Sequence, residues 1–135
     1  MSCFSTLKRR LETEAVLHNR ISDSVIEVYD RRENTGSLRI IIGFPDDDDR
    51  HPYVKCYELG IFPEEKVTAA LEMCNRANNR YSFVKFHIDG DNEVVAEIDA
   101  LVTENNVCDK IFDAIFRMAE VVNDAFPSFA KVRWS

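Results

Sequence analysis

Acidic residues gather at two places in the sequence where they could bind a metal ion. The aspartate run 46–49, followed by His51, offers the carboxylate oxygens that hard cations such as Ca²⁺ prefer. Adjacent residues of an extended loop point in alternate directions, whereas metal ligands must converge on one point. Because a run of like charges is typical of a solvated loop, the sequence predicts a solvated acidic loop here and no metal site.

The second group of candidate ligands occupies alternate positions: His87, Asp89, Asp91 and Glu93. A calcium-binding loop that began at Asp89 would require Gly at its sixth position and Glu at its twelfth. The chain has Val94 and Ala100 there, so the calcium motif fails. Residues 89–92, Asp-Gly-Asp-Asn, are typical of a tight turn between two antiparallel strands.

Thiol chemistry is the other candidate, because a Cys–His pair can form a nucleophile from residues that are distant in the sequence. Cys56 or Cys74 with His87 would supply such a pair. The four cysteines, at positions 3, 56, 74 and 108, are widely spaced and form no C-x-x-C motif. Cys56 and Cys74 fall on apolar stripes, so we expect them to be buried free thiols.

The chain contains no P-loop, dinucleotide-binding, zinc-protease or nucleophile-elbow motif. The sequence therefore predicts a protein that is not an enzyme, with no catalytic, cofactor-binding or metal-binding residues.

The composition indicates a folded acidic domain. The chain has 135 residues, 45% of them hydrophobic, and a net charge of −7, so we expect one domain spanning residues 1–135. An acidic surface repels phosphate backbones and anionic lipids, which disfavours nucleic-acid and membrane partners. No leader peptide or long apolar window is apparent, so we expect a cytoplasmic protein.

Hydrophobic periodicity predicts the elements that position these residues. In the first half, residues 3–20 have the spacing of a helix that Ser2 or Ser5 could cap, and residues 25–29, 38–44 and 53–62 read as strands. In the second half, the pattern predicts helices over 63–79 and from about 106 to Pro127, with strands 83–88 and 94–102 between them. The order is α-β-β-β-α-β-β-α, an α+β fold with helices packed on an antiparallel sheet.

One face of this sheet lacks a predicted covering layer. Its apolar positions are Ile41, Phe83, Val95 and Leu101, mixed with Lys85, His87, Glu97 and Asp99. A half-apolar exposed face is typical of an interaction site, so we predict that the four apolar residues bind a partner. The alternatives are that they are ordinary exposed residues, or that the true strand register differs by one.

The stretch 71–102 resembles the YbjN-like family of bacterial proteins. The residues that carry the resemblance are Asn75-x-x-Asn78 at a helix end, the aromatic strand Phe83-Val84-Lys85-Phe86, the acidic turn Asp89-Gly90-Asp91, the alternating acids Glu97 and Asp99, and a helix from about Asn106. The family is similar in fold to type III secretion chaperones. The resemblance therefore implies a five-stranded antiparallel sheet with helices, often in a dimer.

These observations predict a non-enzymatic protein-binding module, chaperone-like or regulatory, that acts as a homodimer with an unknown protein partner. The alternative is a small-molecule sensor whose pocket lies between the sheet and the helices.

Overall fold

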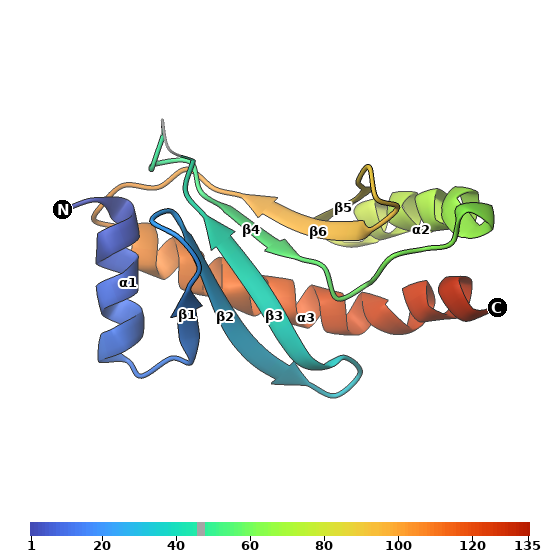
Figure 1. Ribbon diagram of the computed structural model, residues 1–135, viewed down its shortest axis with the longest axis horizontal. Coiled ribbons are helices and arrows are strands. Elements are labelled where there is room, and N and C mark those ends of the chain that lie inside the picture. Colours follow the sequence, from blue (N-terminus) through green and yellow to red (C-terminus); the bar gives the residue numbers. More distant parts are fainter. Residues whose placement is uncertain (46–47) are drawn as a thin grey trace.

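Three α-helices pack on one antiparallel sheet in the computed structural model, which describes residues 1–45 and 48–135 (Figure 1). The helical elements are α1 (Cys3–Thr13), the 3₁₀ turn η1 (Glu64–Lys66), α2 (Val67–Arg80) and α3 (Val107–Trp134). The strands are β1 (His18–Arg20), β2 (Val25–Arg32), β3 (Gly36–Gly43), β4 (Tyr53–Cys56), β5 (Lys85–Ile88) and β6 (Val94–Asp99). This confirms the predicted α+β class.

The sheet has six strands in the order β1-β2-β3-β4-β6-β5, and every pair is antiparallel. Within the described chain β1 and β5 form the two edges. The predicted hairpin is confirmed, because β5 and β6 pair around the turn, where Asp89 Oδ1 accepts hydrogen bonds from the N–H groups of Asp91 (2.9 Å) and Glu93 (3.0 Å).

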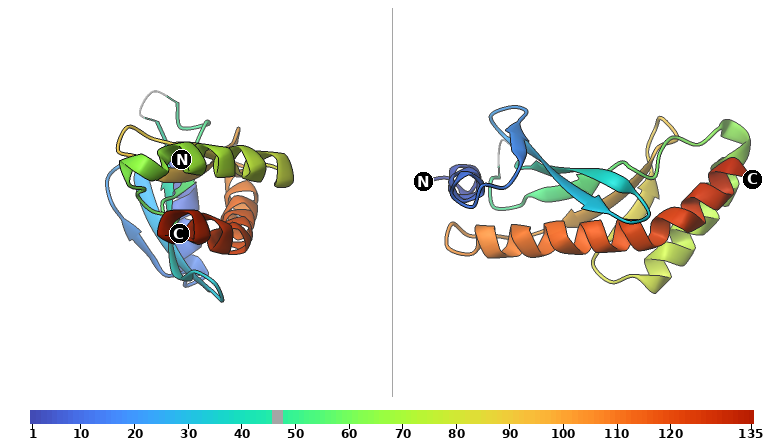
Figure 2. Two further views of the ribbon diagram at one scale, coloured as in Figure 1. Left: turned by 90° about the vertical axis from the view of Figure 1, so that its right-hand side faces the viewer. Right: turned by 90° about the horizontal axis from the view of Figure 1, so that it is seen from below.

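The helices lie on one side of the sheet, and the view from below shows α3 along that side (Figure 2, right). In Figure 1, α3 runs behind the sheet along its full length, with α1 beside one end and α2 at the other. The inward-facing side chains of alternate strand positions meet the buried stripe of α3 and form one core. Its largest fully buried members include Ile40, Ile42, Ile111, Met118 and Phe129.

The prediction of five strands is wrong, because the first helix is shorter than residues 3–20. Ser2 caps α1 by accepting a hydrogen bond from Ser5 N, but α1 ends at Thr13. Ala15 then adopts a φ of 53°, its N–H bonds to Glu12 O (3.1 Å), and the N–H of Val16 bonds to Leu11 O (3.0 Å).

This bond pair is a Schellman motif, which ends a helix and usually has Gly at the left-handed position. With Ala15 there, the sequence carries no visible stop signal. The chain instead reverses and forms β1 against β2.

The prediction that Pro127 ends the last helix is also wrong, since α3 continues to Trp134. Proline lacks the N–H that would bond to the carbonyl four residues earlier, which here belongs to Asn123. The side chain of Asn34 replaces it, because Asn34 Nδ2 donates to Asn123 O at 3.0 Å. α3 bends along its length, visible from below in Figure 2 (right).

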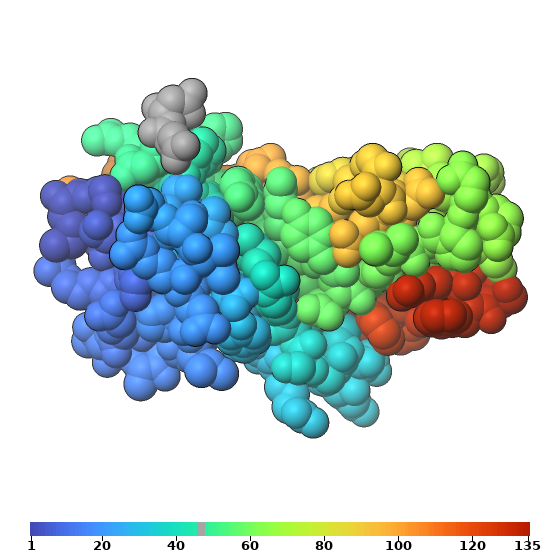
Figure 3. All heavy atoms as spheres, viewed as in Figure 1, coloured from blue at the N-terminus to red at the C-terminus, as the bar shows by residue number. Residues whose placement is uncertain are grey.

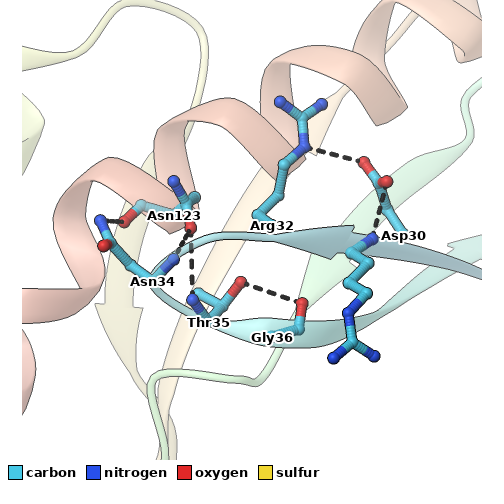
Figure 4. A network of polar contacts seen from close by, with 7 residues as sticks. Asp30, Arg32, Asn34, Thr35, Gly36 and Asn123 are labelled. Atoms are coloured by element: carbon cyan, nitrogen blue, oxygen red, sulfur yellow. Dashed lines mark hydrogen bonds and ion pairs between the residues drawn. The ribbon is translucent and has the colours of Figure 1, made fainter.

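Asn123 also fixes the turn between β2 and β3 (Figure 4). Its Oδ1 accepts hydrogen bonds from the N–H groups of Asn34 (2.7 Å) and Thr35 (3.2 Å). Next to this turn, Arg32 pairs with Asp30 at 3.1 Å. The far end of the β2–β3 hairpin is therefore tied to the middle of α3.

Candidate functional site

The candidate site is the sheet face that points away from the helices, shown toward the viewer in Figure 3. Strand residues alternate between the two faces, so its members follow from the register. We call it the open face, and it comprises Glu27, Tyr29, Arg39, Ile41, Tyr53, Lys55, Lys85, His87, Val95, Glu97 and Asp99.

One row of side chains crosses the open face from edge to edge. Consecutive strand partners place these residues side by side: Asn19, Glu27, Ile41, Lys55, Glu97 and Lys85. Acidic and basic residues thus flank the single apolar residue, Ile41. Opposite charges on neighbouring strands attract, so the row is self-compensating across the face.

In the described part of the chain, one charged residue is buried: Glu27, with 6% of its surface exposed. Its carboxylate accepts hydrogen bonds from the hydroxyl of Tyr29, from Nε of Arg39 and, at 3.2 Å, from Nδ2 of Asn19. The bond from Tyr29 and then that from Arg39 lower the pKa of Glu27 to about 2. Glu27 is therefore a fixed negative charge that orders β1, β2 and β3.

A second polar group forms where β4 meets β6. Lys55 Nζ lies 4.0 Å from Glu97 Oε1 and 4.4 Å from the centroid of the Tyr53 ring. Burial and then a hydrogen bond with Asp99 raise the pKa of Glu97. The Tyr53 ring lies where a Cβ at Gly43 would be, so only glycine at this position leaves room for it.

The four residues predicted to bind a partner are not gathered at one place. Ile41 is half-buried in β3 and faces the open face. Val95 also faces it, opposite His87, but only 2% of its surface is exposed. Two of the four therefore lie on the open face, and one of these is covered.

Phe83 and Leu101 lie outside the strands. Phe83 precedes β5 with a φ of 71°, is 64% exposed, and its ring centroid lies 4.9 Å from the guanidinium carbon of Arg117 on α3. Leu101 follows β6 and is 70% exposed. Phe83 thus contacts the helical side of the molecule. Leu101 lies beyond the C-terminal end of β6, outside the strands of the open face.

The thiols are buried, as predicted. Burial raises the pKa of Cys56 to about 12 and that of Cys74 to about 11. Cys56 faces the core with Ala96 and Phe86, so it lies on the opposite side of the sheet from His87. The considered pair of Cys56 with His87 is not assembled in this arrangement.

The first acidic loop lies partly outside the described residues, which exclude 46 and 47. Asp49 Oδ2 accepts a hydrogen bond from the N–H of Cys3 (2.8 Å) at the start of α1, where a carboxylate is favoured. Over residues 1–45 and 48–135, no three potential ligand side chains converge to hold a metal ion. In the same part of the chain, no helix has the length and apolar character to cross a bilayer.

Among the described residues, hollows lie at opposite ends of the molecule. One, of about 550 Å³, lies between Phe4 and Lys8 of α1 and Arg20 and Phe44 of the sheet. The other, of about 570 Å³, lies between α2 and the C-terminal part of α3 and contains Arg80 and Lys131. The second is formed by helices alone, not by a helix and the sheet as the sensor alternative expected.

Residues 36–130 match the family model described as YbjN, a putative bacterial sensory transduction regulator. The chain belongs to the YbjN family. This confirms the resemblance seen in the second half of the sequence, and the match extends it into the first half. No curated protein sequence matches the chain at a significant level.

Two solved structures are similar in fold. The crystal structure of YbjN from E. coli, a putative transcription regulator, has a TM-score of 0.63 and 14% identity, with 90% of each chain covered. The heterodimeric ExoU–SpcU complex of the type III secretion system of Pseudomonas aeruginosa includes a chain with a TM-score of 0.56 and 15% identity, with 92% of this chain and 94% of that chain covered. A YbjN-type fold similar to that of a secretion-system protein is therefore shown.

Sequence-based reasoning missed the roles of three residues: Glu27 on the open face, and Asn78 and Asn123 on the helices that pack against the sheet. For Glu27 a signal existed, because it lies between the apolar residues Ile26 and Val28 and so had to face away from the core. Asn78 was placed at a helix end, but nothing indicated that its side chain binds the backbone of Phe86 in β5. No local pattern indicates the role of Asn123, since its partners are 88 and 89 residues away.

Proposed function

We propose that this protein is a non-catalytic binding module, chaperone-like or regulatory, that binds another protein through the open face. It acts in the cytoplasm as a homodimer. Each chain forms one YbjN-type domain that spans residues 1–135. Because one fold can serve many functions, the proposal depends on the surface and not on the fold alone.

The observation that carries the proposal is the one-sided covering of the sheet. All three helices pack on one face, while the row from Glu27 to Lys85 across the other face meets no further layer of the described chain (Figure 3). This row joins alternating charges with a half-buried isoleucine, and the ring of Tyr53 lies beside it against Lys55. Such a surface suits a partner whose own charges alternate in the opposite order. The ExoU–SpcU structure is itself a complex of two different proteins, which agrees with such a role.

We further propose that Phe83 and Leu101 border the contact, with Ile41 inside it and Val95 packed beneath. The test is to capture partners from lysate with the wild type and with the single variants Phe83→Asp and Leu101→Asp. The matched control is Leu71→Asp, because Leu71 is 52% exposed on α2.

We expect a set of partners that the wild type and Leu71→Asp capture equally and that Phe83→Asp and Leu101→Asp each lose. Equal capture by all four proteins, each confirmed to be folded by circular dichroism, would refute the assigned contact residues. The absence of any partner that distinguishes the wild type from unrelated acidic domains would refute the binding function itself.

A second candidate function is recognition of an anionic small molecule in the hollow between α2 and α3. Arg80 pairs there with Asp124 at 3.6 Å, whereas Arg76 and Lys131 contact no carboxylate within the described residues. A ligand that binds only the folded state raises its melting temperature. We expect citrate or ATP to raise the melting temperature of the wild type but not that of Arg76→Gln, and no shift with either probe would remove this candidate.

A further inference from the structure

The two edges of the sheet differ in how their outward backbone groups are occupied. At the β5 edge, the side-chain amide of Asn78 on α2 forms the two hydrogen bonds that a neighbouring strand would form. Its Oδ1 accepts a hydrogen bond from Phe86 N (2.7 Å), and its Nδ2 donates to Phe86 O (3.1 Å). Both outward groups of Phe86 are therefore used, which protects this position of the edge against pairing with another chain.

The β1 edge is not closed in this way. The N–H of Ile21 bonds to Val25 O at 2.9 Å. This bond determines which residues of β1 direct their backbone groups toward β2. Because bonded and non-bonded positions alternate, Asn19 faces β2 while the N–H and C=O groups of His18 and Arg20 point outward. No other group of residues 1–45 and 48–135 bonds to these four backbone groups.

Two exposed apolar residues flank this edge strand symmetrically. Leu17 is 71% exposed and Ile21 is 52% exposed, and each lies two residues from Asn19. Extending the alternation of β1 by one residue at each end places all three side chains on the same side, the side of the open face. Asn19 itself is held there by its bonds to Glu27 and Tyr29, both at 3.2 Å.

We propose that β1 pairs antiparallel with β1 of a second copy of this chain, about a two-fold axis at Asn19. This register uses the available groups, because His18 of one copy faces Arg20 of the other and their outward N–H and C=O groups bond across the gap. It also places Leu17 of each copy opposite Ile21 of the other copy, so that the pair occurs on both sides of the axis. The charge of Arg20 is matched within its own chain by Asp23.

The self-complementary register is the reason to assign a second copy rather than an unrelated peptide. Pairing about Asn19 satisfies the hydrogen-bonding positions and covers both apolar side chains at once, and a C₂ interface requires such a match of a surface with itself. Two short strands bury little area, so the dimer is weak and depends on concentration. This inference deepens the homodimer in the proposed function and depends on it.

Cross-linking through Asn19→Cys tests the register. The two copies of residue 19 form a non-hydrogen-bonded pair with Cα atoms about 4.5 Å apart, within the range a disulfide spans. With copper–phenanthroline as oxidant, which accepts the two electrons as the thiols lose two protons, we expect a covalent dimer on a non-reducing gel. The four native cysteines are buried, and Thr68→Cys on the exposed surface of α2 is the matched control.

The second test removes one outward N–H. Arg20→Pro deletes the N–H that points away from β2, whereas Arg20→Ala removes the same side chain but keeps this N–H. Sedimentation velocity is expected to show a concentration-dependent dimer for the wild type and Arg20→Ala, and a monomer for Arg20→Pro with unchanged circular dichroism.

The outcomes separate this inference from the function on which it depends. A wild-type dimer that persists in Arg20→Pro and does not cross-link through Asn19→Cys would place the interface elsewhere, and would overturn the inference while leaving the homodimer intact. A wild type that is monomeric at all concentrations would overturn both the interface and the homodimer, but not partner binding.

Discussion

At the scale of single residues, the open face is organised by buried or crowded side chains rather than by an apolar patch. Glu27 has three hydrogen-bonding partners from β1, β2 and β3, and Tyr53 lies across Gly43. The sequence could indicate that Glu27 faces away from the core, but not which residues bind it. Its partner Arg39 is 12 positions away, and only the register of β2 with β3 brings the two together.

Glu27 should make stability depend on pH in a defined range. Its pKa falls from 4.5 to about 2 on folding, so the ionised carboxylate stabilises the fold fully above pH 4.5, and this contribution is lost as the pH falls toward 2. Glu27→Gln should therefore lower the urea midpoint at pH 6, and the difference from the wild type should shrink between pH 4.5 and pH 2. Glu72→Gln on the exposed side of α2 serves as control, and a difference that does not vary with pH would contradict this role.

A side chain at Gly43 should destabilise the fold, because it would displace the Tyr53 ring. A Cβ there would overlap the Tyr53 ring, so Gly43→Ala is expected to cost about 1–3 kcal/mol in the free energy of unfolding, the usual cost of overpacking. Gly90→Ala is the matched control, because no atom lies within 4 Å of the corresponding Cβ position. Equal urea midpoints for the two variants would show that Tyr53 does not occupy this place.

At the scale of elements, hydrophobic periodicity predicted the α+β order and the β5–β6 hairpin. It failed at two helix ends, each for an identifiable reason. α1 ends in a Schellman motif with Ala15 in place of glycine, which hid the stop and with it β1. α3 passes through Pro127 because Asn34, distant in sequence, bonds to the carbonyl that the proline leaves free.

The link between Asn34 and Pro127 can be measured with a double-mutant cycle. Asn34→Ala leaves the carbonyl of Asn123 without its partner, at an expected cost of about 1 kcal/mol in the free energy of unfolding. In a Pro127→Ala background, the new N–H can bond to that carbonyl, so Asn34→Ala should cost only a few tenths of that. Equal costs in the two backgrounds, measured by urea denaturation, would show that the two residues are independent.

At the scale of the whole molecule, one core lies between the sheet and its helices, and the thiols lie within it. Apolar spacing in the sequence indicated this burial correctly. Sequence could not show that Cys56 and His87 lie on opposite sides of the sheet, because that follows from the pairing of β4 with β6 and β5.

Thiol labelling should therefore report on unfolding. With burial raising the pKa of Cys56 to about 12 and of Cys74 to about 11, we expect a chromogenic disulfide reagent at pH 8 to react with them only as fast as the protein opens. Urea below the midpoint should accelerate labelling in proportion to the open fraction. Rapid labelling of either cysteine in the native protein would instead indicate a reactive thiol and favour an enzyme.

The central claim is that the open face binds another protein. The most direct measurement replaces Tyr53, on β4 of the open face, with the photo-cross-linking amino acid benzoylphenylalanine and irradiates the protein in lysate. The control carries the same group in place of Phe116, which is 55% exposed on the outer side of α3. A discrete adduct from position 53 that is absent from position 116 is the predicted result, whereas adducts from position 116 alone would place partner binding on the helical side and contradict the account.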